Sequence, residues 1–124
     1  GDVSGAIYVV DDESPVDLYL GIGGAPEGVL AAAALSCFGG QMQTRLFLDD
    51  SEIARTNKMG IKDVNKKFNI DEMIKGDVMF CASGVTNGDL VKGVEDIGDS
   101  YKTSTYALHK ETKIFKKVTN IHKK

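Results

Sequence analysis

The alternation of hydrophobic and polar positions predicts strands and helices in turn along the first third of the chain. Residues 16–22 alternate as a strand does and run directly into two glycines. Residues 27–38 are almost all small and apolar, with Pro26 suited to a first helical turn and glycines directly after Phe38. This pattern predicts a helix that is packed on most of its sides. The apolar stretch 4–10 is too short for its pattern to separate a helix from a strand.

The rest of the chain adds one clear helix and several strands. A strand is predicted over 41–48. The run Asp49-Asp50-Ser51 is expected to cap a helix that extends to about Lys58 and is stopped by Gly60. Short helical pieces are expected within 61–75, most clearly at 70–74. Further strands are predicted at 77–84 (buried on both faces), 90–97, 101–110 and 113–121, the last two as a hairpin. The whole pattern predicts one α/β domain over residues 1–124, with a mixed β-sheet flanked by helices.

Composition adds the expectation of tight turns. The chain has 124 residues, of which 42% are hydrophobic and 27% charged, which is typical of a globular domain. It contains 14 glycines but only two prolines, a balance that favours turns and close backbone approaches. No apolar run reaches the roughly 18 residues of a membrane helix, so no membrane partner is expected. Cys37 and Cys81 lie in apolar stretches and are expected to be buried free thiols, which favours a reducing, cytoplasmic location.

Charge is distributed unevenly, although the net charge is only −3. Residues 1–44 carry six acidic residues and no Lys or Arg, whereas residues 101–124 carry seven lysines and one acid, Glu111. The acidic part suits a cation and the basic end suits phosphate, but solvated faces are the favoured interpretation of both. Because the final lysines have only Phe115 as an aromatic neighbour, no nucleic-acid partner is expected.

Residues 17–29, which read DLYLGIGGAPEGV, are the most informative stretch for function. A predicted strand ends here in glycines and a helix begins at once, so backbone N–H groups are open to an anion. Glu27 stands in the first turn of that helix, where a carboxylate either caps the helix dipole or binds a hard cation such as Mg²⁺. The spacing alone leaves both roles open. The glycines lack the spacing of a dinucleotide-binding loop, and an acid beside them would repel pyrophosphate.

The chain closely resembles the class II (GlpX-type) fructose-1,6-bisphosphatases. The resemblance is carried by DLYLGIGGAPEGV at 17–29, by GGQMQ with a following arginine at 39–45, and by ASGVTNGDLVKGV at 82–94. Gly1-Asp2-Val3 is similar to the end of the D-G-D-V motif of this family. The resemblance extends over nearly all residues and implies the carboxy-terminal domain of a member of the lithium-sensitive sugar phosphatase superfamily. The amino-terminal catalytic half of such an enzyme would be absent from this chain.

The resemblance implies a cytoplasmic, metal-dependent hydrolase of fructose 1,6-bisphosphate, which releases the 1-phosphate with Mg²⁺ or Mn²⁺ as cofactor. Such enzymes serve gluconeogenesis, glycerol metabolism or the Calvin cycle. By this resemblance Glu27 is a metal ligand, while Asp2 and Gly24 contact the substrate. No catalytic residue is expected in this chain, so it is expected to be inactive without the missing amino-terminal domain. Loss of that domain would expose apolar surface, which predicts a homo-oligomer.

Two other functions stay open: a stand-alone sugar-phosphate-binding module, and an interaction domain without catalysis. Within the phosphatase hypothesis, sedoheptulose 1,7-bisphosphate is an alternative substrate. Residues 86–89 are predicted as a turn with Asn87 in a left-handed conformation. Arg45 suits either a phosphate or an ion pair, and His109 and His122 are expected to be surface histidines.

Overall fold

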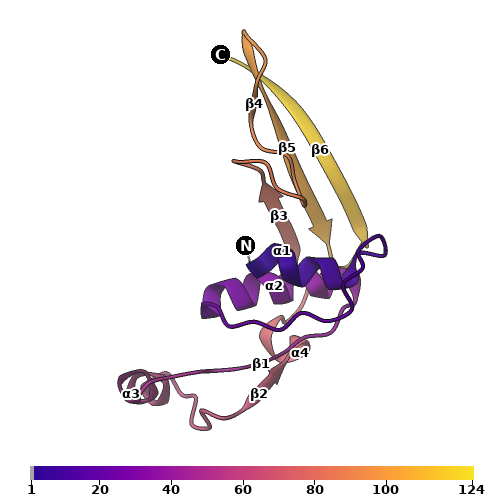
Figure 1. Ribbon diagram of the computed structural model, residues 1–124. Helices are drawn as coiled ribbons and strands as arrows, with labels where there is room; N and C mark the ends of the chain where they lie inside the picture. Colours follow the sequence, from indigo (N-terminus) through magenta and orange to yellow (C-terminus); the bar gives the residue numbers. More distant parts are fainter. Residues whose placement is uncertain (1) are drawn as a thin grey trace.

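The computed structural model of the chain describes residues 2–124, except for the side chain of Asp2. Its elements follow in the order α1 (Asp2–Ile7), η1 (Tyr8–Val10), α2 (Ala25–Phe38), β1 (Gln43–Arg45), α3 (Asp50–Lys58), β2 (Lys67–Asn69), α4 (Ile70–Met73), β3 (Met79–Ser83), β4 (Glu95–Asp96), β5 (Ser100–His109) and β6 (Ile114–Lys123). Strands β1 and β2 form a small sheet, whereas β3, β4 and β6 all pair with the long strand β5. Helices α1 and α2 pack at the end of the β5–β6 hairpin where its turn lies (Figure 1).

Helix α2 carries small apolar residues on nearly every side because it contributes to two hydrophobic clusters. On one side Ala34 and Cys37 pack with Ile7, Phe80, Tyr106 and Leu108, which joins α1 and the large sheet to α2. On the other side Ala32 and Leu35 pack with Ile70 of α4. Burial of Tyr106 in the first of these clusters, with a smaller contribution from the negative charge of Asp11, raises the pKa of its hydroxyl group to about 12. The helix therefore holds the two sheets in one fold.

The ends of α2 and α3 follow the capping signals of the sequence. Pro26 occupies the first turn of α2, and Gly39 ends the helix in a left-handed conformation at φ 78°. The Asp49 side chain accepts a hydrogen bond from the Glu52 backbone N–H at 2.9 Å, and the Glu52 carboxylate accepts one from the Asp49 N–H at 3.0 Å. Both predicted helices are confirmed, and this reciprocal pair is a complete capping box.

The β5–β6 hairpin is confirmed, and a four-residue turn, 110–113, joins its strands. The turn contains neither glycine nor asparagine, and Lys113 adopts a left-handed conformation at φ 54°. An L-residue with a side chain is strained in this region of backbone space. The turn must therefore be supported by contacts from elsewhere in the fold.

Lys113→Gly is expected to raise the free energy of unfolding by about 0.5 kcal/mol, because glycine adopts a positive φ without steric cost. Lys116→Gly, in the extended backbone of β6, is the matched control and is expected to lower it by about 0.5–1 kcal/mol. Urea unfolding of both variants measures the difference. A destabilised Lys113→Gly variant would contradict the interpretation of strain at this position.

Several predicted strands are wrong or too long. Residues 16–22 form no strand and pair with none within the described chain, and Leu18, Leu20 and Ile22 are 70%, 82% and 83% exposed. A strand needs a partner strand for its backbone N–H and C=O groups, and none lies beside this segment; the Tyr19 ring instead lies against Gly5 of α1. The strand predicted at 41–48 is observed only as β1 (Gln43–Arg45), and the strand predicted at 90–97 only as β4 (Glu95–Asp96).

The predicted mixed sheet is also wrong, since every strand pair in residues 2–124 is antiparallel. Strand β3 is buried on one face only: Phe80 is 7% exposed, whereas Met79 is 71% exposed on the other face. Cys81 lies on that open face and is an exposed free thiol, while Cys37 is buried as expected. Burial raises the pKa of the Cys37 thiol.

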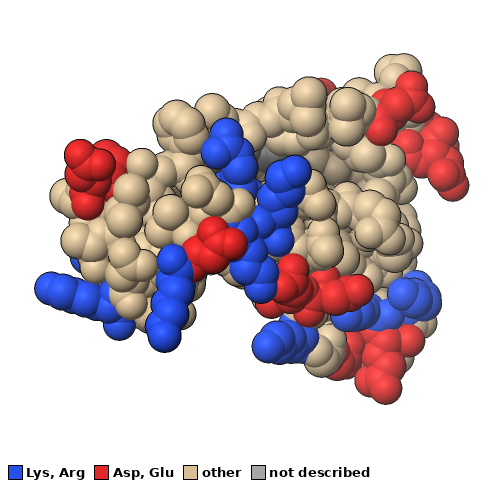
Figure 2. All heavy atoms as spheres, turned by 90° about the horizontal axis from the view of Figure 1, so that it is seen from below, with Lys and Arg blue, Asp and Glu red and all other residues tan. Residues whose placement is uncertain are grey.

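The lysines of the basic end pair with acidic residues just before it in the sequence. Lys102 pairs with Glu95 at 3.2 Å, and Lys124 pairs with Asp96 at 2.7 Å. On the face shown in Figure 2, several basic and acidic side chains lie next to one another. These exposed pairs favour the interpretation of the basic end as a solvated face. None of the described helices is both long and apolar enough to cross a membrane.

Candidate functional site

An open hollow of about 500 Å³ lies between α1, the start of α2, strand β3 and the segment 84–94. We call it the Glu27 hollow. The polar residues along it are Ser4, Glu27, Thr86 and Asp89, and Phe80 and Leu90 are among its apolar residues. No Lys, Arg or His side chain lines it among the residues that the structure describes. The hollow is therefore acidic.

Glu27 and Gly24 lie side by side at the start of α2. Gly24 is the N-cap residue, and its carbonyl accepts a hydrogen bond from the Gly28 N–H at 3.0 Å. A Cβ atom on Gly24 would collide with the carboxylate of Glu27, so glycine leaves the space that this carboxylate occupies. The Glu27 side chain is exposed and free to reach a ligand in the hollow.

The side chain of Asp2, the third residue to which the sequence assigns a binding role, lies outside the described part of the structure. Its backbone begins α1, and Val3 and Ser4 of that helix line the Glu27 hollow. The fold thus brings the segment that carries Asp2 and the start of α2 to the same hollow.

The segment 84–94 forms the opposite wall and is tightly packed against itself. The Asn87 side chain accepts a hydrogen bond from the Gly93 N–H at 3.0 Å, and the Val94 N–H donates to the Val85 carbonyl at 3.2 Å. A Cβ atom on Gly93 would lie 2.6 Å from the Thr86 backbone. Asn87 is not left-handed, contrary to expectation, and uses its side chain to close the loop instead.

The loop holds Thr86 and Asp89 at the hollow, although the sequence alone gave this loop no chemical role. Burial, followed by the nearby charge of Asp89, raises the pKa of the Tyr8 hydroxyl of η1. Only the similarity of residues 82–94 to a known motif pointed to this loop; no spacing signal links Asp89 to Tyr8.

The donor set suits a divalent cation only in part. Carboxylate and hydroxyl oxygens are the ligands that Mg²⁺ and Mn²⁺ prefer. Among the described side chains, residues 3–124, however, no three of His, Cys, Asp or Glu are grouped as a metal site needs. This chain could supply Glu27 as one ligand, and further ligands would have to come from elsewhere. Arg45 lies outside the hollow, with its guanidinium 5.9 Å from the centre of the Phe47 ring.

Comparison with known proteins identifies the family. The model described as bacterial fructose-1,6-bisphosphatase, glpX-encoded, matches residues 1–122. The chain belongs to this family. The class 2 fructose-1,6-bisphosphatase of Haemophilus influenzae is 36% identical over 98% of this chain and 41% of its own length. The fructose-1,6-bisphosphatase 2 class 2 of Escherichia coli is 35% identical, over 87% of this chain and 38% of its own length.

Another relative carries a double name. The D-fructose 1,6-bisphosphatase class 2/sedoheptulose 1,7-bisphosphatase of Synechococcus sp. (strain JA-3-3Ab) is 33% identical over the whole chain and 40% of its own length. The chain thus spans about two-fifths of the length of the curated relatives that it matches. Two motifs, residues 17–29 and 82–94, contribute side chains to the lining of the Glu27 hollow. Both lie within residues 1–122, the range that the glpX-encoded family model matches.

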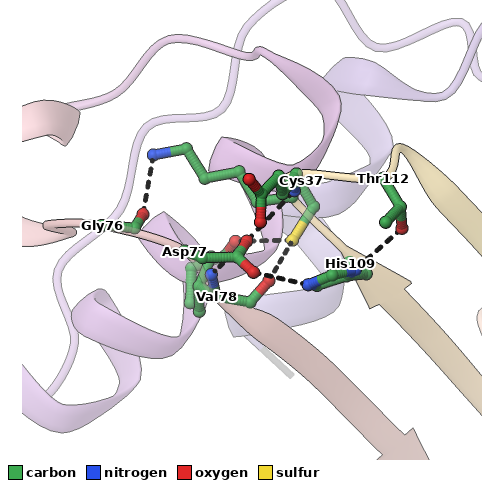
Figure 3. A network of polar contacts seen from close by, with 9 residues as sticks. Cys37, Gly76, Asp77, Val78, His109 and Thr112 are labelled. Atoms are coloured by element: carbon green, nitrogen blue, oxygen red, sulfur yellow. Dashed lines mark hydrogen bonds and ion pairs between the residues drawn. The ribbon is translucent and has the colours of Figure 1, made fainter.

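A second polar network in this glpX-encoded family member lies at the hairpin turn (Figure 3). The His109 ring bonds to Asp77 through Nε2 at 2.6 Å and to Thr112 through Nδ1 at 2.7 Å. The second oxygen of Asp77 accepts hydrogen bonds from the N–H groups of Val78 and Glu111, at 2.9 and 3.1 Å. The His109 side chain is 24% exposed, so it lies partly at the surface, but both of its ring nitrogens are engaged in this network. The network supports the turn that contains the strained Lys113.

Asp77→Asn is expected to lower the thermal midpoint of unfolding at pH 7. It is also expected to make this midpoint fall less when the pH is lowered. Burial opposes ionisation of Asp77, but the hydrogen bonds from His109, Val78 and Glu111 outweigh it and lower its pKa. A carboxyl with a lowered folded pKa stabilises the fold above its unfolded pKa, and this contribution is lost as the pH falls through the folded value. Melting at pH 7 and about pH 2.5 tests this, with exposed Asp71→Asn as the control. Equal acid sensitivity of the native chain and Asp77→Asn would contradict it.

Proposed function

We propose that this chain is the carboxy-terminal part of a metal-dependent fructose-1,6-bisphosphatase, which hydrolyses the 1-phosphate of fructose 1,6-bisphosphate to give fructose 6-phosphate and phosphate. The observation that carries the proposal is the family match over residues 1–122, with its two glycine-rich motifs facing one acidic hollow. Sedoheptulose 1,7-bisphosphate is a second substrate, suggested by the name of the Synechococcus relative.

In this proposal Glu27 holds Mg²⁺ or Mn²⁺ together with oxygen ligands from the amino-terminal part of the enzyme. The bound cation neutralises phosphate charge and activates water. Gly24 leaves room for the Glu27 carboxylate, and Gly24 and Asp2 contact the substrate. Because Mg²⁺ needs several oxygen ligands in near-octahedral geometry, the chain alone is expected to be inactive.

The same proposal accounts for the apolar segment 16–22. Its exposed residues Leu18, Leu20 and Ile22 would be covered by the amino-terminal part in the complete enzyme. In the chain alone we expect self-association to cover them, as a homo-oligomer. The enzyme would act in cytoplasmic carbohydrate metabolism.

The test is a reconstitution. The purified chain is assayed for Mn²⁺-dependent release of phosphate from fructose 1,6-bisphosphate, alone and mixed with a separately expressed amino-terminal part of the Haemophilus influenzae relative. We expect activity only in the mixture. Substantial activity of the chain alone would contradict the division of labour between the two parts. No activity in the mixture, with binding of fructose 6-phosphate by the chain alone, would instead favour a stand-alone binding module.

A further inference from the structure

We propose that two copies of this chain associate through β6. The β6 strands of the two copies pair antiparallel about a two-fold axis at Val118, and this pairing joins their large sheets into one. The proposed function gives β6 no role and places self-association at segment 16–22, so this inference goes beyond it.

The outer edge of β6 is unpaired within the described chain. Only β5 lies beside it in the large sheet (Figure 1). The Lys124 N–H donates to the Asp99 carbonyl at 3.0 Å, which continues the register of the β5–β6 pair by one step. Because backbone groups alternate between the two sides of an antiparallel strand, even-numbered residues of β6 bond to β5 and odd-numbered residues face outward. The outward N–H and C=O groups belong to Phe115, Lys117, Thr119, Ile121 and Lys123.

This edge lacks most of the features that keep other edge strands from pairing. Natural edge strands are commonly short, or are interrupted by proline or a bulge. Strand β6 has 10 residues, contains no proline, and pairs with β5 in an unbroken register. Its lysines are the one protective feature that it has. A long regular edge of this kind can accept a further strand through main-chain hydrogen bonds.

The order of apolar residues in β6 selects a second copy as the occupant. With the two-fold axis at Val118, Phe115 of each copy faces Ile121 of the other, and Val118 faces its own equivalent. Phe115 and Ile121 are 49% and 66% exposed in the single chain. Aromatic and β-branched side chains directly opposite one another stabilise a pair of strands. The two-fold axis forms the Phe115–Ile121 pair twice.

The lysines of β6 tolerate this register and disfavour its neighbours. With the axis at Val118, Lys117 faces Thr119, and Lys116 faces Asn120. An axis at Lys117 would place the two Lys117 side chains opposite each other, and like charges in that position are destabilising. An axis at Thr119 would place each of the apolar residues opposite a lysine or an amide. The protective lysines therefore leave one favourable register open.

Cysteine cross-linking tests this register directly. The two Val118 residues would form a non-hydrogen-bonded pair with Cα atoms about 4.5 Å apart, a separation that a disulfide can bridge. We expect Val118→Cys, in a Cys81→Ser background that removes the exposed native thiol, to run mainly as a covalent dimer on a non-reducing gel after mild oxidation.

The matched control is Asn120→Cys in the same background. Residue 120 lies on the same face of β6, but the two copies of this position would be about 13 Å apart, so this variant should remain monomeric on the gel. Equal cross-linking of the two variants would overturn the register.

Sedimentation of the native chain over a series of concentrations measures the association without cross-linking. We expect a monomer–dimer equilibrium, which Thr119→Pro weakens at least about tenfold because the two-fold axis removes an outward hydrogen bond twice. The Thr119 N–H takes no part in the β5–β6 ladder, so the urea midpoint at low concentration should stay close to that of the native chain.

Ile121→Ser tests the same edge through its side chain and does not depend on how well the fold accepts a proline. It should also weaken the dimer at least about tenfold, because two apolar pairs are lost. Ile97→Ser makes the same chemical change at a residue that is 41% exposed and lies outside β6. It is the control and is expected to leave the equilibrium unchanged.

The other outcomes assign the edge differently. A native chain that is monomeric at every concentration would overturn the inference. A dimer that Leu20→Ser disrupts, and that Thr119→Pro and Ile121→Ser leave intact, would overturn it in favour of segment 16–22. If Val118→Cys cross-links in the chain alone but not in the mixture with the amino-terminal part, that part covers β6, and the inference is overturned for the enzyme.

Phosphatase activity of the reconstituted mixture is an independent measurement. A dimer that depends on β6, without activity in the mixture, would support this inference and contradict the proposed function. Activity in the mixture, without a dimer that depends on β6, would contradict the inference and leave the proposed function supported.

Discussion

Glu27→Gln in the reconstituted enzyme is expected to lower the Mn²⁺-dependent kcat/KM at least about a hundredfold. The substitution keeps the size of the side chain and its place in the first turn of α2, but it removes the negative charge that a divalent cation binds. The loss should be partly recovered at higher Mn²⁺ concentration, because the remaining ligands still bind the cation more weakly. Phosphate release measured across a series of Mn²⁺ concentrations gives both the loss of kcat/KM and its recovery at high Mn²⁺ concentration.

The matched control is Glu111→Gln, which removes an equivalent charge from the exposed hairpin turn. It is expected to leave the activity and its Mn²⁺ dependence unchanged. If Glu27→Gln also had an unchanged Mn²⁺ dependence, the carboxylate would only cap the helix dipole, the alternative that its position in the sequence left open.

Leu108→Ala is expected to lower the free energy of unfolding of the chain by about 2–4 kcal/mol. Leu108 is 3% exposed and packs with Ile7 and Phe80 in the cluster that joins α1 and the large sheet to α2. Truncation would leave a cavity that rigid neighbours on three elements cannot fill. The shift of the urea midpoint at constant slope measures the loss.

Leu20→Ala makes the same chemical change at a residue that is 82% exposed. In the chain alone it should alter the free energy of unfolding by no more than about 0.5 kcal/mol. In the reconstituted enzyme we expect a larger effect, since the proposal has the amino-terminal part cover segment 16–22. An equal effect in both states would argue that this segment stays exposed to solvent.

The helices could be predicted because their signals are local. Asp49 and Glu52 are three residues apart, and Pro26 and Gly39 stand at the two ends of α2. Each cap therefore depends on residues that are close together in the sequence. The hairpin could be predicted for the same reason, from two alternating stretches close together. The turn near Glu111 and Thr112 follows from the same stretches, but its support could not be predicted, because it comes from Asp77, 32 residues before His109.

The failure at residues 16–22 has a different cause. An alternating pattern predicts that one face of a segment will be buried, but it does not say against which part of the protein. Within the described chain, Leu18 and Leu20 have no strand beside them. The same reason explains β3, where a continuous apolar run predicted burial on both faces and only the side facing α2 is covered.

The candidate site was only half predictable. Glu27 and Gly24 stand in one motif and could be read together, whereas Tyr8 and Asp89 come from distant parts of the chain and meet only through the fold. No periodicity or spacing rule links residues so far apart. The place of segment 84–94 opposite Glu27 could therefore not be predicted from the sequence.

The cluster formed by Ile7, Tyr106 and Leu108 has a consequence for biosynthesis. A ribosome adding about 5–20 residues per second needs roughly 5–20 s to reach Leu108 after Ile7. During that interval the faces of α1 and α2 that pack with Tyr106 and Leu108 are not covered by the complete large sheet, and they remain open to chaperones or to aggregation. The β5–β6 hairpin, in contrast, can form within microseconds once its turn has emerged. The last strands to be synthesised thus determine when the first helices become protected.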